Sequence, residues 1–280
     1  MTAAPAVART AQRQQAAAAV EISGVGRVFG SASPVAALEG VDLTVAPGEF
    51  VSLIGPSGCG KSTLLRLVAD LDRPTSGTIA VFGRTPERAR LSHDYGIAFQ
   101  SAGLLPWRTV RANVELPLAL HGTGRGARRE RSDHLLELVG LTDFAEHFPD
   151  QLSGGMAQRV AIARAFSEDP SLLLMDEPFG ALDEMTRERL QGELARICAE
   201  TRAAVIFVTH SIPEAVYLSH RVVVMSARPG CIRRVVPIDL GRSGEREDDV
   251  REDAAYFAAV TQVREALHDG APPARGSDLR

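Results

Sequence analysis

Lys61 constrains the possible folds of this chain more than any other residue does. Lysine and arginine together number 31 among 280 residues, and Lys61 is the only lysine, so arginine stands at every other basic position. A compact ammonium can slot between adjacent phosphates where a planar guanidinium cannot. The segment around Lys61 fits G-x-x-x-x-G-K-[ST], the P-loop pattern. It reads Gly55-Pro56-Ser57-Gly58-Cys59-Gly60-Lys61-Ser62-Thr63.

The residues on either side of this segment supply the context that a P-loop requires. Residues 50–54 form an apolar run that predicts a buried strand, and residues 61–69 have the apolar spacing of a helix. In such a strand–loop–helix unit, glycines let successive backbone N–H groups turn inward, and the helix adds its positive N-terminal end. We therefore expect nucleotide phosphates to bind here, with the Ser62 hydroxyl as a ligand of Mg²⁺.

Two carboxylates follow a second buried strand. Residues 172–175 read Leu-Leu-Leu-Met and lead directly into Asp176 and Glu177. Ligands of parallel α/β sheets bind at the carboxyl ends of the strands, so both side chains are expected beside the P-loop. Asp176 would hold Mg²⁺ through its water shell, and Glu177 could accept a proton from an attacking water. Two adjacent carboxylates after a strand are usually no more than solvent-exposed charges on a loop. The P-loop earlier in the sequence makes that explanation less favoured here.

Strand and helix patterns alternate along much of the chain. In residues 101–165, by contrast, helical patterns dominate and strand signals fade. Outside that stretch a long helix is expected at residues 186–200. Further strands are expected at residues 41–45, 77–83, 171–175, 203–208 and 221–225. This order predicts an α/β fold with a parallel sheet, into which the helical middle is inserted as a subdomain.

Composition excludes several classes of protein. The net charge of −4 argues against a general affinity for nucleic acid. The basic residues 125–131 are interleaved with an acid and are expected to form a solvated face. The three cysteines, Cys59, Cys198 and Cys231, have neither metal-ligand spacing nor a disulfide pattern, which is typical of a reduced cytosolic protein.

Residues 1–19 are rich in alanine and glutamine and are interrupted by arginines. Their uninterrupted apolar run is too short for a signal-peptide core, so we expect a disordered extension. No other stretch approaches the roughly 18 apolar residues needed to span a bilayer. Any membrane role would therefore depend on a partner.

A third motif connects the chain to a known family. Residues 152–159 read Leu-Ser-Gly-Gly-Met-Ala-Gln-Arg, which resembles the LSGGQ signature of ATP-binding-cassette (ABC) ATPases. Ser153 can cap a helix whose N-terminus, left bare by Gly154 and Gly155, faces an anion. In that family the anion is the γ-phosphate held by the other subunit's P-loop, so the resemblance implies a dimer. Met156 departs from the usual glutamine and leaves the Ser-Gly-Gly contact intact.

The resemblance assigns further residues. Gln100 resembles the Q-loop glutamine that senses Mg²⁺ and the γ-phosphate, and Asp183 lies in a segment that resembles the D-loop, which contacts the partner. His210 resembles the switch histidine that touches the γ-phosphate, although Ser211 replaces the frequent following aspartate. Phe29 resembles the aromatic residue that stacks on adenine, while a core position is the common alternative for a phenylalanine at a strand end. ATP and Mg²⁺ are the cofactors implied.

The family also implies an organisation. The fold would be a P-loop NTPase of ABC type, with a parallel sheet, an N-terminal antiparallel β part and the helical subdomain at about residues 101–165. The ATPase domain would span residues 20–240. Residues 241–280 would form a tail with one helix, near residues 253–268.

Three segments resemble importer cassettes for nitrate, aliphatic sulfonates and taurine; the same subfamily includes cassettes for thiamine-pyrimidine precursors. They are residues 101–107, 209–215 and 224–230. Trp107 lies where family cassettes receive a coupling helix of the membrane subunit, and packing within the helical subdomain is its alternative role. The implied partners are permease subunits, a second cassette copy and, indirectly, a solute-binding protein. The resemblance implies a peripheral protein at the cytoplasmic face of the inner membrane. Nucleic acid is not among the expected partners.

Two rival functions stay open at the level of sequence. One is an ABC ATPase without a transporter, acting on nucleic acid or ribosomes. Its known members carry two cassettes in one chain or split the cassette with long coiled coils, and neither feature is present here. The other is the separate cassette of an exporter.

Overall fold

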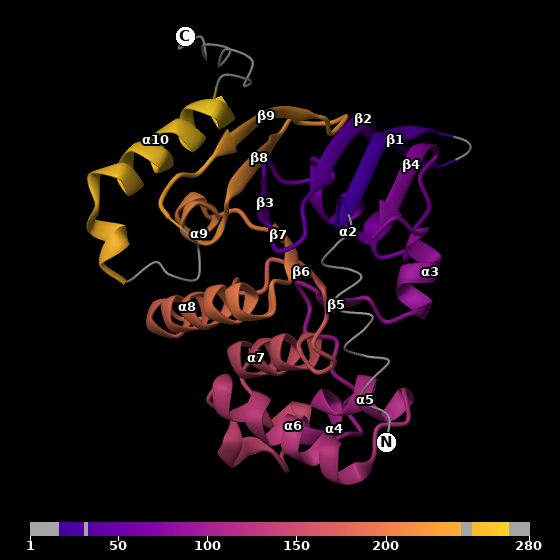
Figure 1. Ribbon diagram of the computed structural model, residues 1–280, viewed down its shortest axis with the longest axis vertical. Helices are drawn as coiled ribbons and strands as arrows, with labels where there is room; N and C mark the ends of the chain where they lie inside the picture. Colours follow the sequence, from indigo (N-terminus) through magenta and orange to yellow (C-terminus); the bar gives the residue numbers. More distant parts are fainter. Residues whose placement is uncertain (1–16, 31–32, 242–247, 269–280) are drawn as a thin grey trace, which may run out of the picture.

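The computed structural model describes residues 17–30, 33–241 and 248–268, and two sheets with flanking helices make up its architecture (Figure 1). The expected extension at residues 1–19 lies, apart from its last three residues, outside this description. Parts of the expected tail, residues 242–247 and 269–280, also lie outside it. Among the described residues, no helix combines the length and apolar character needed to cross a bilayer.

The central sheet has six strands in the described residues, in the order β5-β6-β7-β3-β8-β9. All neighbours pair in parallel except β9, which runs antiparallel to β8. The strands are β3 (Phe50–Ile54), β5 (Tyr95–Ala98), β6 (Leu172–Asp176), β7 (Ala204–Val208), β8 (Arg221–Met225) and β9 (Ile232–Pro237). Every residue of β3, β6 and β7 is buried, as expected for short apolar runs covered on both faces.

A second, antiparallel sheet contains β1 (Val20–Phe29), β2 (Val35–Val45) and β4 (Ser76–Val81), in the order β2-β1-β4. Its inward side chains, such as Ile22 and Val41, share one apolar cluster with β3 and the helix α2 (Lys61–Val68). The predicted α/β fold, with a parallel sheet and an antiparallel N-terminal part, is therefore confirmed. The antiparallel edge strand β9 was not anticipated.

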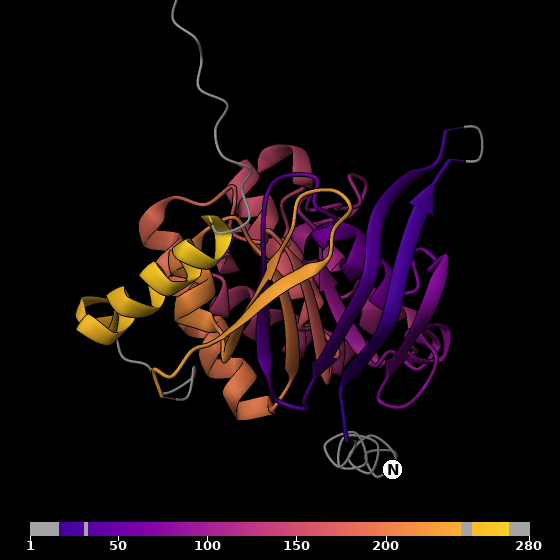
Figure 2. The same cartoon turned by 90° about the horizontal axis from the view of Figure 1, so that it is seen from above.

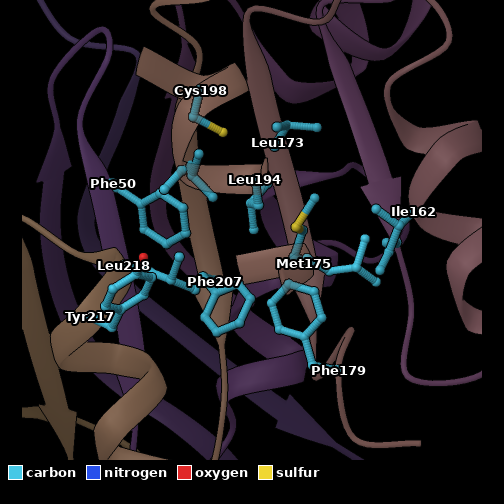
Figure 3. Close-up of a cluster of buried hydrophobic side chains, with 14 of the residues drawn as sticks. Phe50, Ile162, Leu173, Met175, Phe179, Leu194, Cys198, Phe207, Tyr217 and Leu218 are labelled. Carbon is cyan, nitrogen blue, oxygen red and sulfur yellow. The ribbon is translucent and has the colours of Figure 1, made fainter. Parts of the chain in front are cut away.

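Helices cover the other face of the central sheet. Phe50, Phe179 and Phe207 form the middle of this second core, with ring centroids 5.7 and 5.8 Å from Phe207 (Figure 3). The remaining helices are α3 (Pro86–Leu91), α4 (Val110–Val114), α5 (Leu116–Leu120), α6 (Arg125–Leu138), α7 (Gly154–Ala165), α8 (Glu184–Thr201), α9 (Ile212–Leu218) and α10 (Ala254–His268). Short 3-10 turns occur at Thr142–Phe144, Pro149–Gln151 and Asp248–Glu252.

The helices α4 to α7 lie together below the β5 edge of the sheet in Figure 1, and we call them the helical unit. On the other side, α10 packs against α9 and β8, and the Tyr256 hydroxyl donates to the Pro213 carbonyl over 3.2 Å. Figure 2 shows α10 and the β1–β2 hairpin on opposite sides of the central sheet.

The basic segment 125–131 is solvated only in part. Arg125 and Arg129 are exposed on α6, as expected. Arg131 is half-buried, donates to the Phe166 carbonyl over 2.8 Å and pairs with Asp169. The expectation of a solvated face thus fits Arg125 and Arg129 but not Arg128 and Arg131, which are half-buried, and Arg131 ties α6 to the end of α7.

Gly96 on β5 tests how tightly the sheet and the helical unit pack. A Cβ at this position would overlap the Ala165 carbonyl oxygen at the end of α7. Gly96→Ala should therefore lower the free energy of unfolding by about 3 kcal/mol, measured by urea denaturation. Gly126→Ala is the matched control, because a Cβ there meets no atom within 4 Å and alanine favours a helix. Equal stability of the two variants would contradict this packing.

Candidate active site

The P-loop joins β3 to α2, and glycines shape its path. Gly58 and Gly60 have φ angles of 75° and 97°, a region that side chains disfavour. A Cβ on Gly60 would lie 2.6 Å from Leu38 Cδ2, so β2 closes the outer side of the loop. The backbone can therefore curl tightly enough to direct its N–H groups toward one anion.

Lys61 begins α2, and its side chain turns back over the loop. Only 5% of the residue is exposed. Its ammonium donates to the Gly55 carbonyl over 2.8 Å and to the Pro56 carbonyl over 3.2 Å. The third hydrogen faces Cys59 Sγ at 3.7 Å, a weak acceptor, so a phosphate oxygen is a stronger partner for it.

Ser62 and Asp176 come together from α2 and the end of β6. Ser62 Oγ donates to Asp176 Oδ1 over 3.0 Å. Burial raises the pKa of the Asp176 carboxyl, and the Ser62 hydrogen bond opposes that shift. A hydroxyl and a carboxylate are hard oxygen ligands of the kind that Mg²⁺ takes, so these two residues fit that ion.

Three neighbouring strands deliver three polar side chains to one place. Gln100 follows β5, Glu177 follows β6 and His210 follows β7. Glu177 Oε1 lies 2.5 Å from His210 Nε2, and Gln100 Nε2 donates to Glu177 Oε2 over 3.3 Å. Glu177 has a φ of 49°, and its N–H donates to the Val208 carbonyl over 2.9 Å. A left-handed conformation at a glutamate is uncommon and aims its carboxylate at the pocket.

A buried network holds the segment that carries His210. The Thr209 hydroxyl donates to Glu214 Oε2 over 2.5 Å, and the Ser211 N–H donates to the same Thr209 oxygen over 2.9 Å. Burial raises the pKa of Glu214. Ser211 caps α9 by accepting from the Glu214 N–H over 3.3 Å. These bonds fix the backbone on both sides of His210.

One pocket of about 550 Å³ gathers most of the predicted residues. Its lining comprises Phe29, Val35, Ala37, Ser57, Gly58, Cys59, Gly60, Lys61, Ser62, Thr63, Gln100, Glu177, His210 and Arg228. Phe29 is 40% exposed and has the Arg27 guanidinium 4.5 Å from its ring centre, so it is a wall of this pocket and not a core residue. Gly55 and Pro56 contribute the carbonyls that hold Lys61.

Sequence reasoning missed three residues of this lining, Val35, Ala37 and Arg228. Arg228 follows β8, and its Nε donates to the Gly58 carbonyl over 3.0 Å. Because β8 neighbours β3, the rule that ligands bind at the carboxyl ends of strands could have indicated this arginine. Val35 carries no such signal, since it is one apolar residue at the start of a strand.

Ser153, Gly154, Gly155 and Asp183 do not line the pocket. Ser153 caps α7, where its Oγ accepts from the Met156 N–H over 3.2 Å. Asp183 caps α8, and its hydrogen bond with the Thr186 N–H lowers its pKa. Gly155 lies against the Ala181 carbonyl, 3.0 Å from an added Cβ, so the two capped helices start side by side. Ser153, Gly154 and Asp183 are exposed to solvent.

Comparison with known proteins places these features in a family. Residues 38–180 match the model of the family described as ABC transporter. The chain is 47% identical to "Nitrate import ATP-binding protein NrtD" of Synechocystis sp., over 89% of this chain and 94% of that protein. It is 45% identical to "Aliphatic sulfonates import ATP-binding protein SsuB" of Bacillus licheniformis, over 76% and 82% of the two chains.

A solved structure agrees with both comparisons. It is described as the dimeric post-hydrolysis state of the ATP-binding cassette MJ0796 bound to ADP and Pi. It superimposes with a TM-score of 0.74 at 36% identity, over 79% of this chain and 99% of that one. The P-loop, the paired carboxylates and the capped Ser-Gly-Gly helix thus occur here in the order and fold of one enzyme family. The chain belongs to the ABC transporter ATP-binding family and is an ATPase.

Proposed function

We propose that the chain is the ATP-hydrolysing subunit of an importer, in which two copies close on two ATP molecules. The observation that carries the proposal is the meeting of Gln100, Glu177 and His210 at the pocket that Lys61 also lines. Residues 20–240 would be the ATPase domain, with its helical subdomain at about residues 101–165. Such a site can position a water, neutralise phosphate charge and hold the nucleotide in one geometry.

In the proposed reaction a water attacks the γ-phosphorus, the bond to the β-phosphate oxygen breaks, and ADP and phosphate leave. Glu177 accepts the proton of this water, and Gln100 and His210 orient its carboxylate through contacts of 3.3 and 2.5 Å. Lys61 and the P-loop N–H groups stabilise the charge that develops on the phosphate oxygens. Mg²⁺, held by Ser62, Asp176 and Gln100, would supply further neutralisation of that charge. Phe29 would stack on the adenine.

The second copy completes each site. Ser153 and Gly154 present a capped helix N-terminus to solvent and not to their own pocket. A helix N-terminus favours an anion, so the one offered here suits the γ-phosphate bound by a partner's P-loop. Asp183 would meet that partner as well. Cleavage removes the phosphate that both chains hold, and the dimer then opens.

The helical unit offers the surface for a membrane partner. Trp107 is 70% exposed, which favours docking over packing within the subdomain. It follows Leu104 and Leu105, which are half-buried, so the indole is a large apolar group presented on an ordered base. We propose that permease subunits bind here and hold the ATPase at the cytoplasmic face of the inner membrane.

The relatives named for nitrate and sulfonate import support a small solute of the nitrate, sulfonate or taurine class. A solute-binding protein would act indirectly, through the permease. A thiamine-pyrimidine precursor is the alternative solute within the same subfamily. Uptake assays of the assembled transporter with nitrate, taurine and a pyrimidine would separate these solutes.

Glu177→Gln tests the proton acceptor. The amide keeps the shape but cannot accept a proton, so ATP hydrolysis should fall on the order of 100-fold or more while ATP binding is retained. Phosphate release measures the first quantity, and size-exclusion chromatography with ATP should show an accumulated dimer. Glu200→Gln, at the exposed end of α8, is the control and should leave turnover unchanged. Normal turnover of the Glu177 variant would remove this residue from the reaction.

Gly154→Asp tests the contribution of the second copy. No atom lies within 4 Å of a Cβ at this position, and an acid in the first helical turn is locally stabilising, so the fold should persist. The carboxylate would repel a γ-phosphate, so ATP-driven dimerisation and hydrolysis should both be lost while monomers still bind ATP. Gly126→Asp, equally unobstructed in the first turn of α6, is the matched control. Hydrolysis at the normal rate by Gly154→Asp would contradict the two-copy site.

Trp107→Ala tests the docking surface. Loss of an exposed indole should weaken permease binding at least 10-fold, because aromatic anchors dominate interfaces. ATPase activity of the isolated subunit should not change, since Trp107 does not line the pocket. Leu120→Ala, which removes another exposed apolar side chain of the helical unit, is the control. Unaltered co-purification of the Trp107 variant with the permease would refute docking at this surface.

A further inference from the structure

Two histidines and a glutamate from three distant parts of the sequence meet outside the nucleotide pocket. His93, His121 and Glu168 each offer one ligand atom, and these atoms all lie within 4.8 Å of one another. The two imidazole rings have centroids 3.3 Å apart and planes inclined by 35°. His121 Nδ1 is paired with Glu168 Oε1. None of the three residues lines the pocket that holds Lys61 and Glu177.

Each of these side chains starts from a turn that hydrogen bonds hold in place. His93 lies between α3 and β5 with a φ of 56°, and its N–H donates to the Arg90 carbonyl over 3.2 Å. His121 caps the end of α5 with an N–H bond of 3.2 Å to the Pro117 carbonyl. Such anchored backbones bring the three groups together without the need to order a loop.

Glu168 is held from a different direction. It follows α7 in a turn whose Phe166 carbonyl accepts from Arg131 over 2.8 Å and from the Asp169 N–H over 3.3 Å. Arg131 thus explains how a residue beyond the end of α7 keeps a fixed position beside α5. The glutamate side chain is 23% exposed and that of His121 is 26% exposed, so solvent ions can reach both.

The donor atoms select one class of ion. Imidazole nitrogens combined with a carboxylate oxygen suit zinc and the neighbouring divalent transition metals, and three protein ligands leave a position for water. Mg²⁺, which would accompany ATP, prefers an all-oxygen shell and is a poor match. We propose that His93, His121 and Glu168 form a binding site for one divalent transition-metal ion of the zinc class.

The location of the site suggests what an ion there would do. His93 belongs to the segment that enters β5, the edge strand after which Gln100 follows. His121 caps the end of α5, and Glu168 follows the end of α7, so both adjoin the helical unit. A bound ion would therefore tie the edge of the central sheet to the helical unit, and native-state binding of this kind stabilises the fold in proportion to the logarithm of ion concentration.

Titration of the full chain with zinc tests this site. The protein would be made without a histidine tag, treated with a chelator and measured in millimolar Mg²⁺ by calorimetry. We expect one Zn²⁺ per chain and a rise in Tm of at least about 3 °C at saturation. His121→Gln, Glu168→Gln and His93→Asn should each weaken binding at least 10-fold, asparagine being chosen because it tolerates a left-handed backbone.

The controls separate this site from binding elsewhere. His134→Gln removes an exposed histidine on α6 and should keep full affinity. Circular dichroism and ATP binding of each variant show that it is folded. Cobalt(II) in place of zinc adds a spectroscopic readout, in which a thiolate band would assign the ion to a cysteine. That band, or unchanged zinc affinity in the folded His121 and Glu168 variants, would overturn the proposal and leave only a contact between His121 and Glu168.

Discussion

The burial of β3 between two parallel neighbours is the constraint on which the rest of the structure depends. β3 pairs with β7 on one edge and β8 on the other, and all of its residues are buried. The P-loop continues from this strand into a space that leaves no room for a side chain at Gly55 or Gly60. An added Cβ on Gly55 would lie 2.8 Å from the Met225 carbonyl, and one on Gly230 would overlap the Cys59 carbonyl. The β8–β9 hairpin and β2 therefore shape the loop from outside as much as its own glycines do.

The same burial that orders the site costs stability there. Burial raises the pKa of Asp176, so above the unfolded value for aspartate, about 3.9, the folded state pays for ionising this group. The resulting penalty grows as pH rises from that value through the raised folded pKa and is constant above it. A cation beside Asp176 relieves the penalty, so the residue that best fits Mg²⁺ is also one that the fold alone does not favour in its charged form.

The sequence indicated the charged residues of the P-loop and the strand ends more readily than the other residues that surround the pocket. Lys61, Asp176 and Glu177 were predicted because spacing and strand ends carry their signal. Arg228 also follows a strand of the sheet and lies in the segment 224–230 that resembles importer cassettes, but no motif assigns it a role in the pocket. His93, His121 and Glu168 had none, because only tertiary packing brings three such distant positions together. Likewise Arg131 resembled surface charge, and the Phe166 carbonyl that it contacts is invisible to any pattern of residue types.

The helix α7 explains how these separate features act on one another. At its start Ser153 faces outward, and within it Gln158, 3% exposed, donates to the Phe99 carbonyl over 2.9 Å. Near its end Arg164 donates to the Ala102 and Gly103 carbonyls over 2.8 and 2.9 Å. The chain on both sides of Gln100 is therefore bonded to one rigid element.

That element connects three surfaces that sequence distance separates. A displacement of Gln100 at the pocket would strain the hydrogen bonds of Gln158 and Arg164, two of which are partly buried and therefore costly to leave unmade. Ser153 caps the start of α7, and the segment leading to Trp107 is hydrogen-bonded to Arg164 near the end of the same helix. If a second copy and a permease bind as proposed, α7 would couple their contacts to those at the nucleotide, through the side-chain hydrogen bonds that it makes to backbone carbonyls.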